Sequence, residues 1–214
     1  MTRVPTYSAA QVRAAEAPLL AAGVPLMRRA AHALAELVVE RAPDGLLVLA
    51  GAGDNGGDAL FAAAELAAGG TRVDIVRVHE RVHEQAFAAA VDAGASVIPT
   101  ADPTLGSHGL VVDGILGIGA RGGLRGAARE VVERLLPSRP AVVAVDLPSG
   151  LDPDTGDADD VVLPAATTVT FGAVKHGLTV GSGPRLAGGI LLVDLGLELE
   201  NPVGRATIAG VRQG

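Results

Sequence analysis

The stretch that decides the fold is "LLVLAGAGDNGGDAL", residues 46–60. Its first five residues are all apolar, which is typical of a strand buried on both faces of a sheet. A turn follows in which Gly51, Gly53 and Gly56 match G-x-G-x-x-G, and an alanine-rich segment over residues 61–68 is then predicted to be a helix. Strand, glycine turn and helix in this order are typical of a dinucleotide-binding βαβ unit.

Strands and helices alternate along the chain on both sides of this stretch. Further strands are predicted at residues 72–78, at Ser96, at 110–116 and 141–146, and near Thr168 and Leu192. Helices are predicted at residues 8–22, 25–41, 80–93 and 127–136. The pattern predicts an α/β fold: a Rossmann-like doubly wound, mostly parallel sheet with helices on both faces. We expect one domain over residues 1–214, with about 198–214 as a tail or linker because their periodicity is weak.

The composition narrows the possible functions. The chain of 214 residues contains no cysteine, which excludes disulfides and thiolate chemistry. A net charge of −7 argues against a nucleic-acid partner, which needs clustered Lys and Arg. The chain has no apolar run of about 18 residues, so no membrane partner is expected. It also begins without the apolar core of a signal peptide, and we therefore expect a cytoplasmic protein.

Acids and amides follow the predicted buried strands. Asp54 and Asn55 come after the first strand, Asp113 lies in the strand at 110–116, and Asp146 ends the strand at 141–146. Ligands of open parallel sheets bind beyond the carboxyl ends of the strands, where the strand order reverses. If the first and fourth strands flank that point, these side chains face one cleft.

The glycine turn itself is an unfavourable place for a pyrophosphate. Asp58 is expected in the first helical turn, where its carboxylate can occupy the free N–H groups that would otherwise bind an anion. Asp54 adds a second like charge, and no Gly-Lys-Ser/Thr follows as in a P-loop. A hydride-transferring NAD(P) oxidoreductase is therefore disfavoured. A plain tight turn with a capping Asp remains an alternative.

Four segments in one order carry a resemblance to a known family. They are "GAGDNGGDA", "VVDGILGIGARGG", "AVDLPSGLDPDTG" and "VTFGAVKHG". Together they resemble the YjeF N-terminal domain family, the NAD(P)H-hydrate epimerases, and the segment "YSAAQVRAAEAPLLAAGVPLMRRAA" looks like the family's opening helices. The resemblance covers about residues 7–196.

The resemblance implies a function in repair of nicotinamide cofactors. The substrate would be hydrated NADH or NADPH, which carries a hydroxyl on carbon 6 of the nicotinamide ring, and the reaction would interconvert its R and S epimers. The implied functional partner is an ADP- or ATP-dependent NAD(P)H-hydrate dehydratase. The resemblance also implies a homodimer, and the apolar, alanine-rich segment 8–41 suits a buried interface.

Site residues are carried over by position. A potassium ion would be bound by Asn55, Asp113 and Ser149. The substrate would be contacted by Asp54, Asn55, Gly56, Gly57 and Asp58, by the second loop of Gly117, Ile118, Gly119, Ala120, Arg121, Gly122 and Gly123, and by Asp146.

These residue types suit the chemistry. Potassium is a hard cation, and oxygen ligands from Asn, Asp and Ser suit it. The glycines of the second loop allow close approach to phosphates, and Arg121 or Arg125 could supply positive charge. Asp146 is the candidate catalytic group, a carboxyl that exchanges a proton with the carbon 6 hydroxyl. Lys175 is expected at the surface or facing a phosphate.

Some positions depart from the family's pattern. Asp54 stands for the first Asn and Ala59 for the last Gly of the family's Asn-Asn-Gly-Gly-Asp-Gly. "DGILGIG" stands for "DALFGTG", and "FGAVKHG" for "FGAPKPG". An alternative is therefore a catalytically silent binding or scaffold module of the same family.

Overall fold

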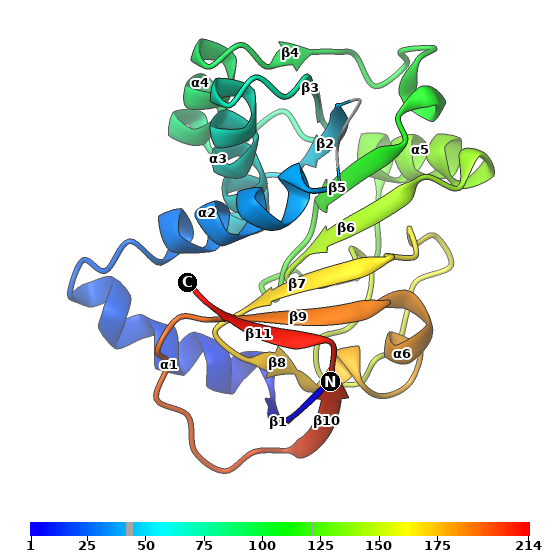
Figure 1. Ribbon diagram of the computed structural model, residues 1–214. Coiled ribbons are helices and arrows are strands. Elements are labelled where there is room, and N and C mark those ends of the chain that lie inside the picture. Colours follow the sequence, from blue (N-terminus) through cyan, green and yellow to red (C-terminus); the bar gives the residue numbers. More distant parts are fainter. Residues whose placement is uncertain (42–44, 121) are drawn as a thin grey trace.

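An eight-stranded sheet forms the centre of the computed structural model, which describes residues 1–41, 45–120 and 122–214 (Figure 1). The strand order is β11-β9-β7-β6-β5-β2-β3-β4, and every neighbouring pair is parallel. The strands are β2 (Leu46–Ala50), β3 (Val73–Arg77), β4 (Ser96–Val97), β5 (Leu110–Gly114), β6 (Ala141–Val145), β7 (Thr167–Phe171), β9 (Gly189–Asp194) and β11 (Gly210–Gln213). The predicted fold class is confirmed.

Helices cover both faces of this sheet. In Figure 1, α2 (Leu26–Val39), α3 (Asp54–Ala68) and α4 (Glu84–Asp92) lie on one side, and α5 (Gly126–Leu135) lies on the other. The remaining helices are α1 (Ala9–Ala21) and the short α6 (Gly183–Leu186), with 3-10 turns at Leu105–Ser107, Leu136–Ser138 and His176–Leu178. No helix in the described part of the chain combines the length and apolarity needed to cross a bilayer.

The strand order reverses between β2 and β5. The chain runs from β2 outward to β3 and β4, and then returns to the other side of β2 as β5. The loops after β2 and β5 therefore diverge at their shared edge, which is where ligands bind in open parallel sheets. The first and fourth predicted strands, β2 and β5, therefore flank the switch point as expected.

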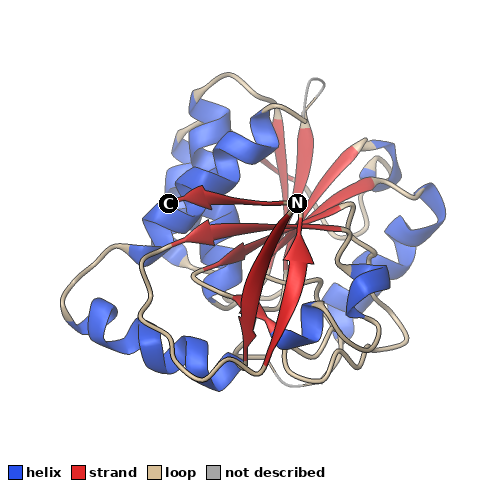
Figure 2. Cartoon of the chain, turned by 60° about the horizontal axis from the view of Figure 1, so that its bottom comes forward, coloured by secondary structure: helices blue, strands red, loops and turns tan. Residues whose placement is uncertain are grey.

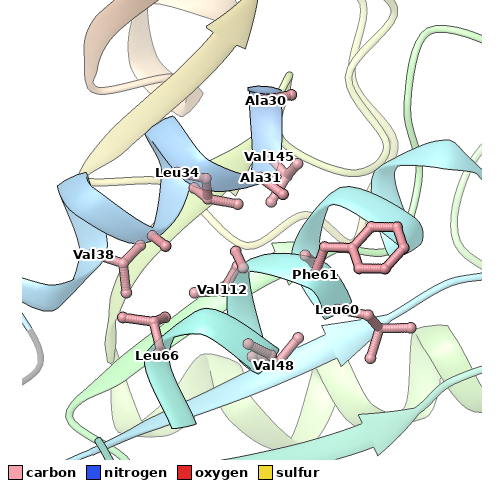
Figure 3. Packing of buried hydrophobic residues seen from close by; sticks show 14 of the residues in the cluster. Ala30, Ala31, Leu34, Val38, Val48, Leu60, Phe61, Leu66, Val112 and Val145 are labelled. Atoms are coloured by element: carbon pink, nitrogen blue, oxygen red, sulfur yellow. The ribbon is translucent and has the colours of Figure 1, made fainter. Parts of the chain in front are cut away.

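Small apolar side chains fill the layers between helices and sheet. Figure 3 shows Val48 of β2 and Val112 of β5 beneath Leu34 of α2 and Leu60 of α3. Alternate residues of the same strands, such as Leu47 and Val111, pack on the opposite face with α5. Alanines such as Ala31 let α2 and α3 pack closely over the sheet, which fixes the position of the loop between β2 and α3.

A second, three-stranded sheet was not predicted. It has the order β10-β1-β8, formed by β10 (Gly204–Ile208), β1 (Thr2–Tyr7) and β8 (Val174–Lys175), and Figure 2 brings this part of the molecule forward. β1 pairs antiparallel with β10 and parallel with β8. Because β11 also extends the main sheet beside β9, the segment 198–214 is integrated into both sheets and is not a free tail or linker.

Two helix starts differ from the prediction. The helix after the glycine turn begins at Asp54, seven residues earlier than expected, with Gly53 as its N-cap, because the turn closes directly into the helix. α4 begins at Glu84 and not at Glu80. His83 is its N-cap, and the His83 side chain accepts a hydrogen bond from the Ala86 N–H at 3.2 Å. The predicted capping box of Ser8 and Gln11 at the start of α1 is present.

Candidate active site

Asp113 and Ser149 form a buried pair at the carboxyl ends of β5 and β6. Each is 1% exposed. The Ser149 hydroxyl donates to Asp113 Oδ1 at 2.6 Å, and the Ser149 N–H donates to Oδ2 at 2.9 Å. Burial raises the pKa of Asp113, while the hydrogen bonds from Ser149 and from the Ile115 N–H oppose that rise.

Asn55, in the first turn of α3, contacts the same place. Its side-chain amide donates to the Leu116 carbonyl at 2.9 Å and to the Val145 carbonyl at 2.6 Å. The Leu116 N–H in turn donates to the Ser149 hydroxyl at 2.9 Å. The loop after β5 therefore links Asn55 to the pair of Asp113 and Ser149, so the three predicted cation ligands come together.

Asp146 is the residue directly after β6, and its backbone is unusual. Its φ of 67° lies in the left-handed region, which is costly for a residue with a side chain. The Asp146 N–H donates to the Val169 carbonyl at 2.7 Å, so β7 holds this conformation. Strained residues of this kind concentrate at functional sites.

The Asp146 carboxylate forms a buried ion pair with Lys175. Lys175 Nζ donates to Asp146 Oδ1 and also to the Phe171 carbonyl at 2.8 Å, and the lysine is 1% exposed. The Thr170 hydroxyl and the Phe171 N–H donate to the same carboxylate oxygen at 3.1 and 3.2 Å. The prediction of a surface or phosphate-facing Lys175 is wrong, because β8 carries the residue into the interior beside β7.

Asp58 is a third buried acid and has a different environment. It lies one turn into α3, not in the first turn, which Asp54 occupies instead. It is 7% exposed, and none of the hydrogen bonds found in the described part of the chain reaches its carboxyl group. Burial raises its pKa well above the ordinary value, and the negative charges of Asp146, Asp54 and Glu16 add to the rise.

The glycines of the turn serve chain packing. A Cβ on Gly51 would lie 1.9 Å from the Ile115 carbonyl oxygen, and one on Gly56 would lie 2.2 Å from that of Gly51. Gly117 likewise leaves room for Asn55, whose Oδ1 would be 2.4 Å from an added Cβ. The glycines therefore bring the loop after β2 against the loop after β5.

Two adjoining cavities open at this edge of the sheet. One of about 510 Å³ lies between the glycine turn, the end of β3 and the second loop, and its lining includes Gly53, His79, Gly119 and Arg125. The other, of about 210 Å³, is lined by Glu16, Asp58, Asp146 and apolar side chains. Asp54, Asn55 and Ile118 line both.

The second loop is described except for Arg121, which lies outside the described residues. Gly117, Ile118, Gly119, Ala120 and Gly123 line the larger cavity, and Gly122 borders a smaller neighbouring one. The Asp159 carboxylate accepts a hydrogen bond from the Leu124 N–H at 3.0 Å, which fixes the end of this loop. Arg13 of α1 donates to the Ile118 carbonyl at 2.6 Å and fixes its middle.

The site contains two residues that sequence reasoning missed. Lys175 was available in "FGAVKHG", but its pairing depends on the contact of β8 with β7. Glu16 carried no signal, because it is one acid on an otherwise ordinary helix, and burial raises its pKa. No group of three His, Cys, Asp or Glu side chains in the described ranges is arranged to hold a metal ion.

The fold and this site define a Rossmann-like α/β protein with an acidic ligand cleft at the switch point of its sheet. Comparison with known proteins identifies it more closely: the family model of the YjeF-related protein N-terminus matches residues 23–177, and the chain belongs to this family.

Named relatives are similar over most of the chain. It is 61% identical over 205 residues to the NAD(P)H-hydrate epimerase of Microbacterium testaceum (strain StLB037), covering 92% of this chain and 80% of the relative. It is 41% identical over 207 residues to the bifunctional NAD(P)H-hydrate repair enzyme Nnr of Mycobacterium tuberculosis (strain ATCC 25618 / H37Rv), covering 90% of this chain and 42% of that one. The crystal structure of yeast ynu0, YNL200c, matches with a TM-score of 0.77 at 19% identity, over 91% of this chain and 90% of that chain, which shows the common fold.

Proposed function

We propose that the protein is an isomerase that interconverts the R and S epimers of hydrated NADH and NADPH. The observation that carries the proposal is that Asn55, Asp113 and Ser149 are linked at the switch point of the sheet, and that Asn55 and Asp146 line one cavity there. These are the residues that the family resemblance assigns to the cation and the substrate. The names of the similar proteins support the same reaction.

The two cavities suggest how the substrate binds. The smaller one holds the acids, and the hydrated nicotinamide ring belongs there, beside Asp146 and Asp58. The larger one extends from Asn55 along the glycine turn and the second loop, and it suits the rest of the dinucleotide. Arg125 lines it and supplies a positive charge for the phosphates.

Asp146 is the proposed catalytic residue. Loss of the carbon 6 hydroxyl as water leaves an iminium ion in the ring, and return of water to the opposite face inverts the centre. The Asp146 carboxylate, held in a buried ion pair with Lys175, is suited to stabilise the cationic ring and to take a proton from the returning water.

We also propose a potassium site at Asn55, Asp113 and Ser149. The donor chemistry fits, because all three offer oxygen atoms. The buried Asp113 carboxylate forms no ion pair with a Lys, Arg or His of the described residues, so a cation would balance its charge. When bound, the ion would hold the loops after β2, β5 and β6 together and so order the substrate site.

The biological setting is proposed from the family. We propose a cytoplasmic enzyme whose functional partner is an ADP- or ATP-dependent NAD(P)H-hydrate dehydratase, since relatives such as the Mycobacterium tuberculosis enzyme are named as bifunctional repair enzymes. We also propose a homodimer. Leu20 of α1 and Val39 of α2 are exposed and suit an interface there, and the molar mass in solution tests it.

The test is direct conversion of one epimer. Purified R epimer of hydrated NADH is incubated with the protein, and the S epimer is followed by chromatography against the uncatalysed background. A rate well above background supports the proposal. Binding of the hydrated cofactor at the background rate would instead show a silent binding module, and turnover of NADH with a reducible substrate would show an oxidoreductase.

A further inference from the structure

Asp58 is buried without the partners that a buried carboxyl group normally has. Taking a charged carboxylate out of water costs several kcal/mol unless hydrogen bonds or a counter-charge repay it. Asp113 has three hydrogen bonds, and Asp146 has three donors including a cation. Asp58 has none within the parts of the chain that the structure describes, and it borders the cavity that Asp146 also lines.

Lys175 acts on Asp58 only at a distance: it opposes the rise in the pKa of Asp58 but forms no described hydrogen bond or ion pair with it. Lys175 is already engaged by the Asp146 carboxylate, the Thr170 hydroxyl and the Phe171 carbonyl. The other charged groups that act on Asp58 are Asp54 on its own helix and Glu16 on α1, both of which are acids. Asp58 and Asp146 line the same cavity of about 210 Å³, yet only Asp146 has a counter-charge.

We propose that Asp58 is a second catalytic residue: it is the acid that protonates the departing carbon 6 hydroxyl, while the Asp146 carboxylate takes the proton of the incoming water. The proposal rests on the proposed epimerase function. Where two carboxyl groups in one cavity have different environments, they can serve as the general acid and the general base of one reaction.

The reaction balances with these two groups. Asp58 gives its proton to the hydroxyl oxygen, the carbon 6–oxygen bond breaks with its electron pair on the departing water, and the ring nitrogen lone pair forms the double bond to carbon 6. Water then bonds to carbon 6 from the other face, the nitrogen regains its pair, and the extra proton passes to Asp146. A proton returns from Asp146 to Asp58 through water, and the reverse reaction uses the two groups in exchanged roles.

The electrostatics support this division of work. Burial and the charges of Asp146, Asp54 and Glu16 raise the pKa of Asp58, so it retains a proton at a pH at which an ordinary aspartate has lost it. Asp146 differs from Asp58 in its contacts, because its carboxylate is paired with Lys175 and accepts hydrogen bonds from Thr170 and Phe171. Water that has added to an iminium ion is strongly acidic, so a carboxylate suffices to take its proton.

The first test is Asp58→Asn, which keeps the size of the side chain and loses no described hydrogen bond. We expect kcat to fall by about 100- to 10,000-fold, as for loss of a positioned acid, with the dissociation constant for hydrated NADH changed only a few-fold. For the wild type, kcat/KM should fall as the pH rises through the raised pKa of Asp58. This fall is the alkaline limb of the pH profile, and it should be absent in Asp58→Asn.

Glu16→Gln is the matched control, since it neutralises another acid of the same cavity. It lowers the pKa of Asp58 and should shift the alkaline limb to lower pH without removing it. This measurement leaves Asp58 intact, so it remains informative if Asp58→Asn folds poorly.

The outcomes separate the two proposals. A wild type that never exceeds the background rate overturns the epimerase function itself. An active wild type whose Asp58→Asn variant keeps its rate and its alkaline limb, or loses only affinity, overturns the role of Asp58 alone. The role of Asp58 is likewise overturned if the limb stays in place in Glu16→Gln.

Discussion

Asp146 and Lys175 depend on each other, because both are buried and each supplies the other's counter-charge. Removing one member of such a pair leaves an uncompensated charge in the interior, at a cost of about 3–5 kcal/mol. The pair also orients the carboxylate toward the cavity through Thr170 and Phe171. A variant at either position therefore affects stability and chemistry at once.

We expect Asp146→Asn to lower the epimerisation rate by about 100- to 10,000-fold, since the amide cannot cycle a proton. Its affinity for the hydrated cofactor should change far less, because we propose that the larger cavity binds most of the dinucleotide. Chromatographic rates, corrected for background, measure the effect.

The double variant Asp146→Asn/Lys175→Met is the folding control, since it removes the unpaired charge. It should melt at a higher temperature than the single variant and remain inactive. Wild-type rates in a folded Asp146→Asn would exclude Asp146 as a catalytic residue.

Two departures from the family's pattern compensate each other. Ala59 stands where the family has Gly, and Gly114 stands where it has Ala. A Cβ added to Gly114 would lie 2.5 Å from the Ala59 Cβ, and Ala59 is fully buried. One methyl group therefore fills the space between α3 and β5. In this chain Ala59 of α3 supplies it, whereas in the family's pattern the Ala on β5 would supply it.

This exchange predicts a stability effect. Gly114→Ala should cost about 1–3 kcal/mol by overpacking, and Ala59→Gly about 1 kcal/mol because glycine weakens a helix. The double variant should lose less than the sum, with a coupling of about 0.5–3 kcal/mol. A double-mutant cycle by urea unfolding measures the coupling. Additive losses would contradict the exchange.

At the scale of elements, the sequence predicts the strands whose residues form continuous apolar runs. The apolar runs at 46–50, 110–114 and 141–145 are strands, and their order brings the predicted cation ligands together. β1, β10 and β11 were missed, because each combines few large apolar residues with polar, Gly or Pro residues and so lacks the apolar run of the central strands. The ion pair of Lys175 was missed for a related reason: β8 has two residues and pairs with β1, which is distant in the sequence, so no local pattern predicts its place.

The loops after β2, β5 and β6 give a prediction about potassium. If the ion binds at Asn55, Asp113 and Ser149, it stabilises the folded state by linkage, by about 2.7 kcal/mol at a hundredfold excess over its dissociation constant. We expect a higher melting temperature in potassium than in tetramethylammonium at equal ionic strength. Ser149→Ala should lose most of this difference. Equal melting temperatures of the wild type in both salts would remove the potassium site.

For the whole molecule, Asp58 makes stability depend on pH in a defined direction. Its pKa is raised in the folded protein above the ordinary value of 3.8, so between these two values the folded state binds more protons than the unfolded state. Stability from this group is therefore greatest at low pH and falls as the pH rises toward the raised pKa. Other groups of the molecule titrate as well, so the contribution needs a matched comparison.

Asp58→Asn supplies that comparison. The variant should be more stable than the wild type at neutral and alkaline pH, and its advantage should shrink as the pH falls toward 4. Melting temperatures of both proteins at half-unit pH steps measure the difference. A difference independent of pH would mean that the ionisation of Asp58 does not change on folding.

The small sheet has a practical consequence for spectroscopy. The chain contains no tryptophan and a single tyrosine, Tyr7 of β1, whose partner in the strand pairing is Lys175. The ring is buried, and its hydroxyl donates to the Leu199 carbonyl at 3.5 Å. Intrinsic fluorescence of this protein therefore comes from one ring, beside the lysine that pairs with Asp146. Changes in its emission report, without any label, whether β1, β8 and the segment after β9 are in place around the site.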